Sequence, residues 1–315
     1  MMRCSHAMLM ALCAMTVLAL PCFAQDAPPA ADAVVEEQAV VADPVMLRYA
    51  YEQDETLTYE TSIDGVGSVH VMGQAQAIEM VGKMLVNLLV EEIDEEGNFV
   101  TVTEVDIREL SVTMDGSPVP PPSQDIQMRT KMSPRGEILD LQLTQAVNQE
   151  GAQSPWNSEM AKMLTGGFDL NRMILGQKVA AFPEEAVKPG DEWAGNAQEV
   201  EVQGQTAPLV ITTKYVSNIE LEDRECAVLD SEACMQPAAL GQLATMLSME
   251  GSTTTQSRSW FDIESGRQVA SMEKTQVSMQ VSLPGEMTGA GGAAMVFVEM
   301  FVDTQTKLLP VEEEE

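Results

Sequence analysis

Two short patterns in the sequence have residue types that could support catalysis or bind a metal. Ser271 and Lys274 have the Ser-x-x-Lys spacing of penicillin-recognising enzymes, whose chemistry needs both side chains on one side of a helix start. We expect this segment to be a strand, in which residues three apart point to opposite faces, so we interpret the spacing as coincidence. Residues 94–98 resemble a fragment of a calcium loop but lack its closing glutamate, and we expect an acidic hairpin tip there.

Other candidates for catalysis are sparse. His70 lies between two valines, with no arrangement of Ser, Cys or Asp identifiable around it, so we interpret it as a structural strand residue. Some of the 49 Asp and Glu residues must lie close together, and a glycosidase pair stays open as an alternative. Aromatic residues make up only 4% of the chain, which disfavours a sugar-stacking cleft. We expect a protein that is not an enzyme and that holds no metal or cofactor.

The N-terminus has the pattern of a secretory signal. Arg3 precedes an apolar run at residues 7–20, Pro21 ends the run, and small residues precede Gln25, as at a signal cleavage site. The run is shorter than the about 20 apolar residues that span a membrane. We expect residues 1–24 to be removed and the mature protein to be exported, soluble, to the periplasm or the extracellular space, with no transmembrane span. Lipidation of Cys22 is the alternative, which Pro21 disfavours.

Composition divides the rest of the chain. Residues 25–44 are mostly Ala, Pro, Asp, Glu and Val without a hydrophobic period, as in a disordered linker. Residues 45–308 have enough apolar residues for a single β-rich domain, in which we expect two lobes, at 45–150 and 180–308. Residues 309–315 form an acidic tail.

The charge of the chain excludes two classes of partner. There are 17 Lys and Arg against 49 Asp and Glu, a formal net charge of −32. Such a protein cannot bind nucleic acid by neutralising phosphates, and an anionic membrane surface would repel it. We therefore expect neither nucleic acid nor an anionic membrane surface as a partner.

Two cysteines, Cys226 and Cys234, remain after the expected cleavage. In an oxidising compartment a disulfide between them would close a short loop, which stabilises a fold by very roughly 2–3 kcal/mol. Two buried thiols are the alternative, and the spacing does not decide between the two. Of these, we favour the disulfide.

Alternating apolar and polar residues predict β-strands through most of the domain. The clearest runs are residues 209–221 and 269–283, whose apolar side chains occupy odd positions. Within residues 98–114 the apolar phase changes after Val102 and again after Ile107, which predicts two β-bulges and a strongly curved sheet. The turn signals between the runs are Asp64-Gly65, residues 94–98, Asp115-Gly116, Glu222-Asp223 and Ser265-Gly266. Neighbouring strands can therefore pair as an antiparallel meander.

Only two helices are expected. Ser154-Pro155 marks the start of the first, and Pro237 opens the second, at residues 237–250, with one apolar face. The predicted fold is mainly β: one long, strongly curved antiparallel sheet, an open half-barrel, with two short helices covering its dry face.

Methionine is unusually frequent, at 23 residues. These side chains could fill gaps in a core, line a pocket for a variable apolar ligand, or bind copper(I). Copper is disfavoured because Met160/Met163 and Met246/Met249 are helix-face pairs in apolar company. If helix 237–250 is a lid over the sheet, the ligand-lining candidates are Leu240, Leu243, Met246, Leu247, Val277, Met279 and Val281.

Three turn motifs carry a resemblance to known proteins. They are Ser133-Pro134-Arg135-Gly136-Glu137, Pro183 with Val187-Lys188-Pro189-Gly190-Asp191-Glu192-Trp193, and Phe261-Asp262 with Gly266. In this order they resemble an uncharacterised family of exported bacterial β-proteins, over residues 46–283 or so. The architecture looks like the half-barrel carriers of the lipoprotein-localisation type, whose concave face holds acyl chains. We expect the motif residues themselves to be structural, as turns.

Two functions stay open on the sequence. In the first, a non-catalytic exported protein binds a lipid-like or other hydrophobic partner on the concave face of its sheet. In the second, the core is fully packed, and the protein is a structural platform that contacts an envelope protein. The space between sheet and helices distinguishes them, because a ligand pocket has a volume of roughly 300–1,000 Å³.

Overall fold

The structure is a computed structural model that describes residues 43–71, 74–119, 126–145, 180–195, 198–202, 205–235, 250–283 and 294–310. The expected signal, most of the linker and the end of the acidic tail lie outside the described residues. So do both predicted helices, apart from Glu250, which begins a strand. In the described ranges no helix has the length and apolar character needed to cross a membrane.

The described residues form thirteen strands, several of them far longer than the usual about five or six residues. They are β1 Thr56–Val71, β2 Gln74–Ile93, β3 Phe99–Met114, β4 Ser117–Val119, β5 Ile126–Met132, β6 Ile138–Gln145, β7 Glu192–Ala194, β8 Gln198–Val202, β9 Gln205–Leu221, β10 Arg224–Met235, β11 Glu250–Asp262, β12 Arg267–Leu283 and β13 Ala294–Leu308.

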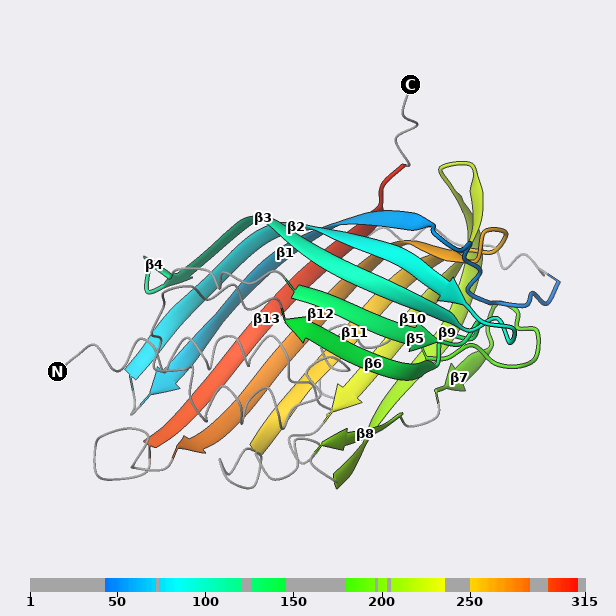
Figure 1. The fold of residues 1–315 in the computed structure, drawn as a ribbon. Coiled ribbons are helices and arrows are strands. Elements are labelled where there is room, and N and C mark those ends of the chain that lie inside the picture. Colours follow the sequence, from blue (N-terminus) through cyan, green and yellow to red (C-terminus); the bar gives the residue numbers. More distant parts are fainter. Residues whose placement is uncertain are drawn as a thin grey trace.

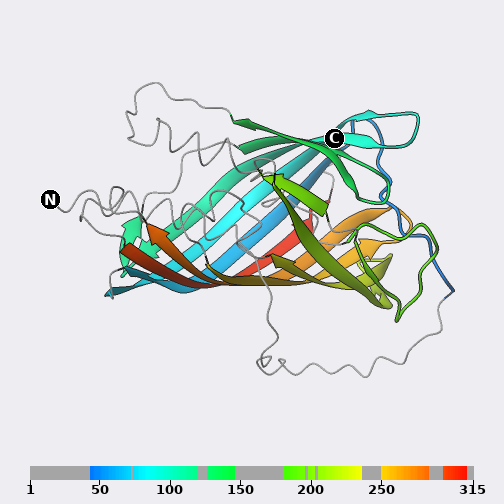
Figure 2. The same ribbon diagram turned by 90° about the horizontal axis from the view of Figure 1, so that it is seen from below.

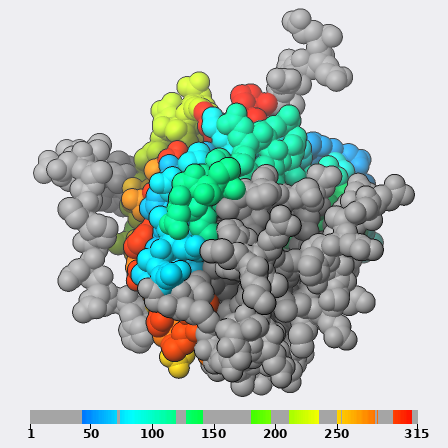
Figure 3. Space-filling view, turned by 90° about the vertical axis from the view of Figure 1, so that its left-hand side faces the viewer, coloured from blue at the N-terminus to red at the C-terminus, as the bar shows by residue number. Residues whose placement is uncertain are grey.

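The strands belong to one antiparallel sheet in the order β6-β5-β3-β2-β1-β13-β12-β11-β10-β9-β7, with β4 on β3 and β8 on β9. Most neighbours in the sheet are neighbours in sequence, which confirms the predicted antiparallel meander. The first and last long strands, β1 and β13, pair in the middle of the sheet. In the space-filling view, the cyan of the N-terminal strands therefore lies against the red and orange of the C-terminal strands (Figure 3). The sheet is open, with β6 and β7 at its edges.

The sheet bends round an open side. β5 and β6 pass in front of β10–β12 in Figure 1, and the view from below shows β3, β5 and β6 opposite the C-terminal strands (Figure 2). One of the two predicted bulges in β3 is confirmed. Lys83 pairs with Glu109 and Met84 with Ile107, so Arg108 is an extra residue in β3. Such an extra residue bends a strand and increases its twist.

The other predicted bulge in β3, after Val102, is wrong. Residues 101–105 pair with β2 without a register shift. Within residues 101–105, the buried residues on the phase of Val105 are Thr101 and Thr103. Polar threonines occupy these inward positions. The alternation of apolar residues therefore changes phase in the sequence, although the strand itself continues without a bulge.

The predicted turn at Asp64-Gly65 is also wrong. Both residues lie within β1, where Asp64 pairs with Asp303 and Gly65 with Val302. Glycine is needed nearby for a different reason, because a Cβ at Gly67 would lie 2.3 Å from the backbone oxygen of Glu299 in β13. Gly67 therefore serves the packing of β1 against β13 and not a chain reversal.

The remaining turn predictions agree with the backbone. Asp115 and Gly116 have φ values of 48° and 73°, and Glu222 and Asp223 have 52° and 61°, as in two-residue hairpin turns. At the β2–β3 tip, the Asp94 carboxylate accepts hydrogen bonds from the amides of Glu96 and Asn98. The bond from Lys131 is the main reason that the pKa of Asp94 lies below its usual range.

The first of the three turn motifs joins one edge of the sheet to a distant segment. Residues 133–137 form the turn between β5 and β6, closed by the bond from the Gly136 amide to the Ser133 carbonyl (2.8 Å). The amide of Phe182 donates to the carbonyl of Arg135 (2.8 Å), and Arg135 Nε donates back to the carbonyl of Phe182 (2.7 Å). The Arg135 guanidinium also pairs with Glu184 at 3.0 Å.

The second motif carries that segment to the opposite edge. The amide of Gly190 donates to the carbonyl of Tyr215 in β9 (2.7 Å), and the amide of Tyr215 donates to the carbonyl of Asp191 (2.9 Å). The Asp191 carboxylate accepts from the amide of Lys188 (3.0 Å), as expected for a turn. The contacts of residues 133–137 and 180–191, which we call the clasp, thus connect the β5–β6 edge to the β9 edge.

The third motif and the N-terminal segment complete this end of the molecule. Val45 and Val187 exchange backbone hydrogen bonds of 2.7 and 2.8 Å, and the amide of Ala50 donates to the carbonyl of Gly266 (3.1 Å). A Cβ at Gly266 would lie 2.6 Å from the carbonyl oxygen of Arg48. Residues 43–50 are therefore held between all three motifs, and the expectation that these motifs are structural is confirmed.

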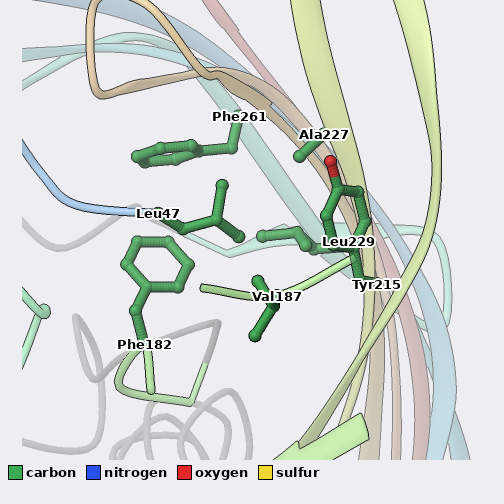
Figure 4. Close-up of a cluster of buried hydrophobic side chains, with 7 residues drawn as sticks. All are labelled: Leu47, Phe182, Val187, Tyr215, Ala227, Leu229 and Phe261. Carbon is green, nitrogen blue, oxygen red and sulfur yellow. The ribbon is translucent and has the colours of Figure 1, made fainter. Parts of the chain in front are cut away.

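Behind the clasp lies the aromatic plug, a buried cluster drawn in Figure 4. Its members are Leu47, Phe182, Val187, Tyr215, Ala227, Leu229 and Phe261. Tyr49 packs against it, with ring centroids 5.3 Å from those of both Phe182 and Phe261. The Tyr49–Phe261 pair is edge-to-face, and such ring pairs contribute about 0.5–1.5 kcal/mol beyond the burial of their area.

We expect Gly67→Ala to lower the free energy of unfolding by about 1–3 kcal/mol, the usual cost of overpacking. The new methyl group meets a backbone oxygen, which can move only if β1 and β13 separate. Gly65→Ala is the matched control on the same face of β1, because its nearest neighbour is the flexible Met80 Cε at 3.3 Å. Removing a strand glycine there should change stability by no more than about 1 kcal/mol, in the stabilising direction. Urea denaturation measures both, and equal losses would contradict the packing argument.

The tyrosines predict how the fold responds to alkali. Burial raises the pKa of Tyr49 to about 12. Burial, followed by the charge of Glu225, raises the pKa of Tyr215 to about 12. Burial also raises the pKa of Tyr51 and Tyr59, which completes the four tyrosines of the chain.

Unfolded tyrosines lose their protons near pH 10, so between about pH 10 and 12 the unfolded state binds fewer protons than the folded state. The free energy of unfolding should therefore fall with rising pH in this window, by up to about 1.4 kcal/mol per pH unit for each tyrosine. Melting temperatures recorded across the window measure the fall, and Tyr49→Phe should make it shallower. Tyrosine ionisation near pH 10 without any loss of structure would show that these side chains are not buried.

Candidate functional site

Cross-strand pairing divides the sheet into two faces, because residues directly opposite each other share a face. Val69 pairs with Val298 and Val298 pairs with Met279, so these three buried side chains lie together. The same face carries the aromatic plug, through the pairing of Leu229 with Tyr215. We call this the inner face and its opposite the outer face.

An aliphatic field covers part of the inner face on the central strands. Its members are Val69, Ile78, Met80, Val277, Met279, Val296, Val298 and Met300, all of them buried. Among the described strands, each packs extensively only against its neighbours in the sheet. The field is therefore an apolar surface separate from the plug, with no second layer of described strands over it.

The structure places two of the predicted ligand-lining residues in this field. Val277 and Met279 lie side by side with Met300 and Val298 of β13. Val281 pairs with Val296 in the same phase of β12, although its side chain lies outside the described part of the chain. The predicted lid residues Leu240, Leu243, Met246 and Leu247 also lie outside the described residues, so their role stays a prediction.

A band of hydroxyl side chains separates the plug from the field, and the sequence analysis missed it. Ser259 pairs with Ser271, Ser271 with Thr306, and Thr306 with Thr61. The hydroxyl band consists of Thr61, Thr213, Ser231, Thr255, Ser257, Ser259, Ser271, Thr275, Thr304 and Thr306. The signal was present in the sequence, since Ser271 and Thr275 share the phase of Val277 and Met279.

Some hydroxyls of the band form hydrogen bonds with each other, and others have no such partner. Thr213 contacts Ser231 at 2.8 Å, and Thr61 contacts Thr306 at 3.1 Å. Ser259 and Ser271 are 1% and 2% exposed, and neither hydroxyl has a hydrogen-bond partner in the described part of the chain. A buried polar group without a partner costs about 1–3 kcal/mol. These two hydroxyls are therefore a deviation from the usual pairing of buried groups.

Open hollows among the described residues lie mainly on the outer face. One of them, of about 940 Å³, crosses β9 to β13 and is lined by charges of both signs, including Lys214, Arg258, Lys274, Asp230 and Glu232. The Arg258 guanidinium donates two hydrogen bonds to the Asp230 carboxylate, at 2.7 and 2.8 Å. The lining of this hollow has five acidic and three basic residues, so its formal charge is negative.

The outer face also carries an apolar patch on the two central strands. Val66 pairs with Phe301 and His70 with Phe297. Val66, Phe297 and Phe301, which we call the outer patch, are 53%, 43% and 54% exposed. Exposed apolar side chains that cluster in this way mark protein contact sites more often than isolated ones do.

The catalytic and metal motifs acquire no further support. Ser271 lies on the inner face and Lys274 on the outer face, so the expectation that these residues point to opposite faces of a strand is confirmed. His70 Nε2 contacts the Ser68 hydroxyl at 3.2 Å, but among the described residues no carboxylate contacts the ring. No group of three or more His, Cys, Asp or Glu in the described ranges could hold a metal ion.

The predicted disulfide between Cys226 and Cys234 is wrong. Both cysteines lie on the uninterrupted strand β10, eight residues or about 26 Å apart at the usual rise of a strand. A disulfide needs Cα atoms within about 7 Å of each other, so two cysteines this far apart on one strand cannot form one. Burial, followed by the charge of Asp262, raises the pKa of Cys226 to about 11 and makes its thiol unreactive.

Comparisons with known proteins give only distant likenesses. No protein family matches the sequence, and a search of curated proteins finds no match. A structure of lipid–protein interactions in lipovitellin is 10% identical with a TM-score of 0.41, and the match covers 84% of this chain but only 27% of that one. A protein of the DUF1329 family from Desulfovibrio piger is 10% identical with a TM-score of 0.15, covering 77% of this chain and 83% of that chain.

Proposed function

We propose that this protein is a non-catalytic, exported binding protein that holds a lipid-like or otherwise hydrophobic ligand against the aliphatic field. The observation that carries the proposal is the field itself, a continuous set of buried apolar side chains on the inner face of an open, curved sheet, with no second layer of described strands over it. The aromatic plug already supplies a compact core at the clasp, so the field is a second apolar surface. Export rests on the signal pattern of residues 1–24.

The composition of the field suits a ligand of variable shape. Three of its eight members are methionines, whose unbranched and polarisable side chains adapt to irregular apolar partners. Burying apolar surface contributes about 25 cal/mol per Å², so a long hydrocarbon chain would gain most of its affinity from contact alone. Such a site needs no metal, no cofactor and no catalytic residue.

Native mass spectrometry of the full chain purified from its own host tests the proposal, because a protein of this kind should retain bound lipid. After removal of the lipid, it should bind a hydrophobic fluorescent dye that added lipid displaces. Met279→Ala removes part of the field and should weaken dye binding several-fold. Leu229→Ala, in the plug, is the control: it should leave dye binding unchanged and lower the free energy of unfolding by about 2–5 kcal/mol.

If no lipid is retained and no dye binds, the field is simply the centre of a packed core, and the proposal is wrong. In that case Met279→Ala and Leu229→Ala should destabilise the protein by similar amounts, since both would leave a cavity.

The outer patch favours a second candidate function, a platform that contacts another envelope protein. Phe297→Ser with Phe301→Ser should weaken binding to such a partner by at least ten-fold, because buried aromatic anchors dominate interfaces. The same double variant should leave both the melting temperature and dye binding unchanged. Quantitative cross-linking in intact cells, with Ser278→Ala on the same face as control, measures the contact. Equal cross-linking by parent and double variant would exclude the patch as an interface.

A further inference from the structure

We propose that the ligand is amphipathic, with an uncharged, hydrogen-bonding head such as a glycerol ester or alcohol on the hydroxyl band and a hydrocarbon chain along the aliphatic field. This inference rests on the proposed function and specifies the chemical class of ligand. Its basis is the order of the inner face along the strands, which runs from plug to hydroxyl band to field.

The order is clearest on β12. Its inner positions run from Ser271 through Thr275 to Val277 and Met279, so the polar side chains lie at one end and the apolar ones at the other. From Ser271 to Met279 the strand spans about 26 Å at the usual rise per residue. β13 repeats the order in the opposite chain direction, with Met300 in the field and Thr304 and Thr306 in the band. A ligand lying along these strands would meet one polar and one apolar region.

The two buried hydroxyls without described partners supply the specific contact points. Ser259 and Ser271 lie directly opposite each other on neighbouring strands, and both are almost fully buried. Buried hydroxyls in native proteins are nearly always hydrogen-bonded. A ligand head with a hydroxyl or an ester carbonyl could bond to both, whereas a pure hydrocarbon would leave them unsatisfied.

Charge in the band selects against an anionic head. Among the described residues of the band and the field there is no Lys or Arg, and Glu273, between Ser271 and Thr275, is the charged residue at an inner position there. Burying a phosphate or carboxylate without a cation beside it is strongly unfavourable. An uncharged polar head avoids this cost.

The test uses the full chain after removal of bound lipid and measures displacement of a hydrophobic fluorescent dye. The competitors are a monoacylglycerol, a lysophospholipid and a hydrocarbon of equal chain length. We expect the monoacylglycerol to displace the dye best. Ser259→Ala and Ser271→Ala should each weaken the monoacylglycerol about five-fold, the effect of one uncharged hydrogen bond, and should leave the hydrocarbon unchanged. Ser278→Ala, on the outer face of β12, is the matched control and should change neither.

Melting curves exclude loss of the fold as an explanation. Removing a hydroxyl that lacks a partner in the protein should leave the melting temperature of the ligand-free alanine variants equal to or above that of the parent. The rise in melting temperature caused by monoacylglycerol should then be smaller in the variants. A smaller rise with an unchanged ligand-free value supports the inference.

Two results would overturn it. If the alanine variants bind monoacylglycerol as tightly as the parent, or if the lysophospholipid binds as tightly as the monoacylglycerol, then the head does not use the band, although the proposed binding of hydrophobic ligands stands. If none of the competitors displaces the dye, or the dye does not bind, both the inference and the proposed function are wrong.

Discussion

The clasp is the interaction on which the rest of the structure depends, because an open sheet has no hydrogen bonds of its own to hold its edges together. Two arginines bind carbonyl groups there. Arg135 donates to Phe182, and Arg48 donates to Pro183 at 2.7 Å and to Glu184 at 2.9 Å. The polar groups of irregular backbone inside a protein need hydrogen-bond partners. The two guanidinium groups supply partners for these carbonyls and also connect distant segments of the chain. These contacts connect two distant parts of the bent sheet at this end of the molecule.

The inner face carries three different types of side chain in succession along the strands. At the clasp, the aromatic plug buries large rings and provides the stable core. Beyond it, hydroxyl side chains replace aromatic ones, and beyond those the aliphatic field begins. A sheet selected for stability alone would continue its apolar face through the middle, since unpaired hydroxyls such as those of Ser259 and Ser271 weaken a core. Their position next to the field is what connects the packing of this protein to the kind of ligand proposed for it.

The two faces of the sheet also differ in what they offer to a partner. The outer face is exposed to solvent, and its hollow across β9 to β13 is lined by charges of both signs, of which Arg258 and Asp230 pair with each other. It also carries exposed apolar side chains, among them those of the outer patch on β1 and β13. A macromolecule would therefore meet the outer face, while a small apolar ligand would find its contacts on the inner face. The two candidate functions use different surfaces and do not exclude each other.

The sequence by itself determined the strand content, the antiparallel order, most hairpin turns and the bulge at Arg108, because these depend on alternation and on turn residues close together in the chain. It also placed Val277 and Met279 on the face that the structure shows to be buried. It failed where a residue type serves long-range packing: Gly67 makes room for β13, and Thr101 and Thr103 are polar residues that point inward. A disulfide between Cys226 and Cys234 was favoured, whereas both cysteines lie on one continuous strand. Only the tertiary structure brought the three turn motifs together around residues 43–50 and set the hydroxyl band beside the field, because both depend on the register of strands far apart in the sequence.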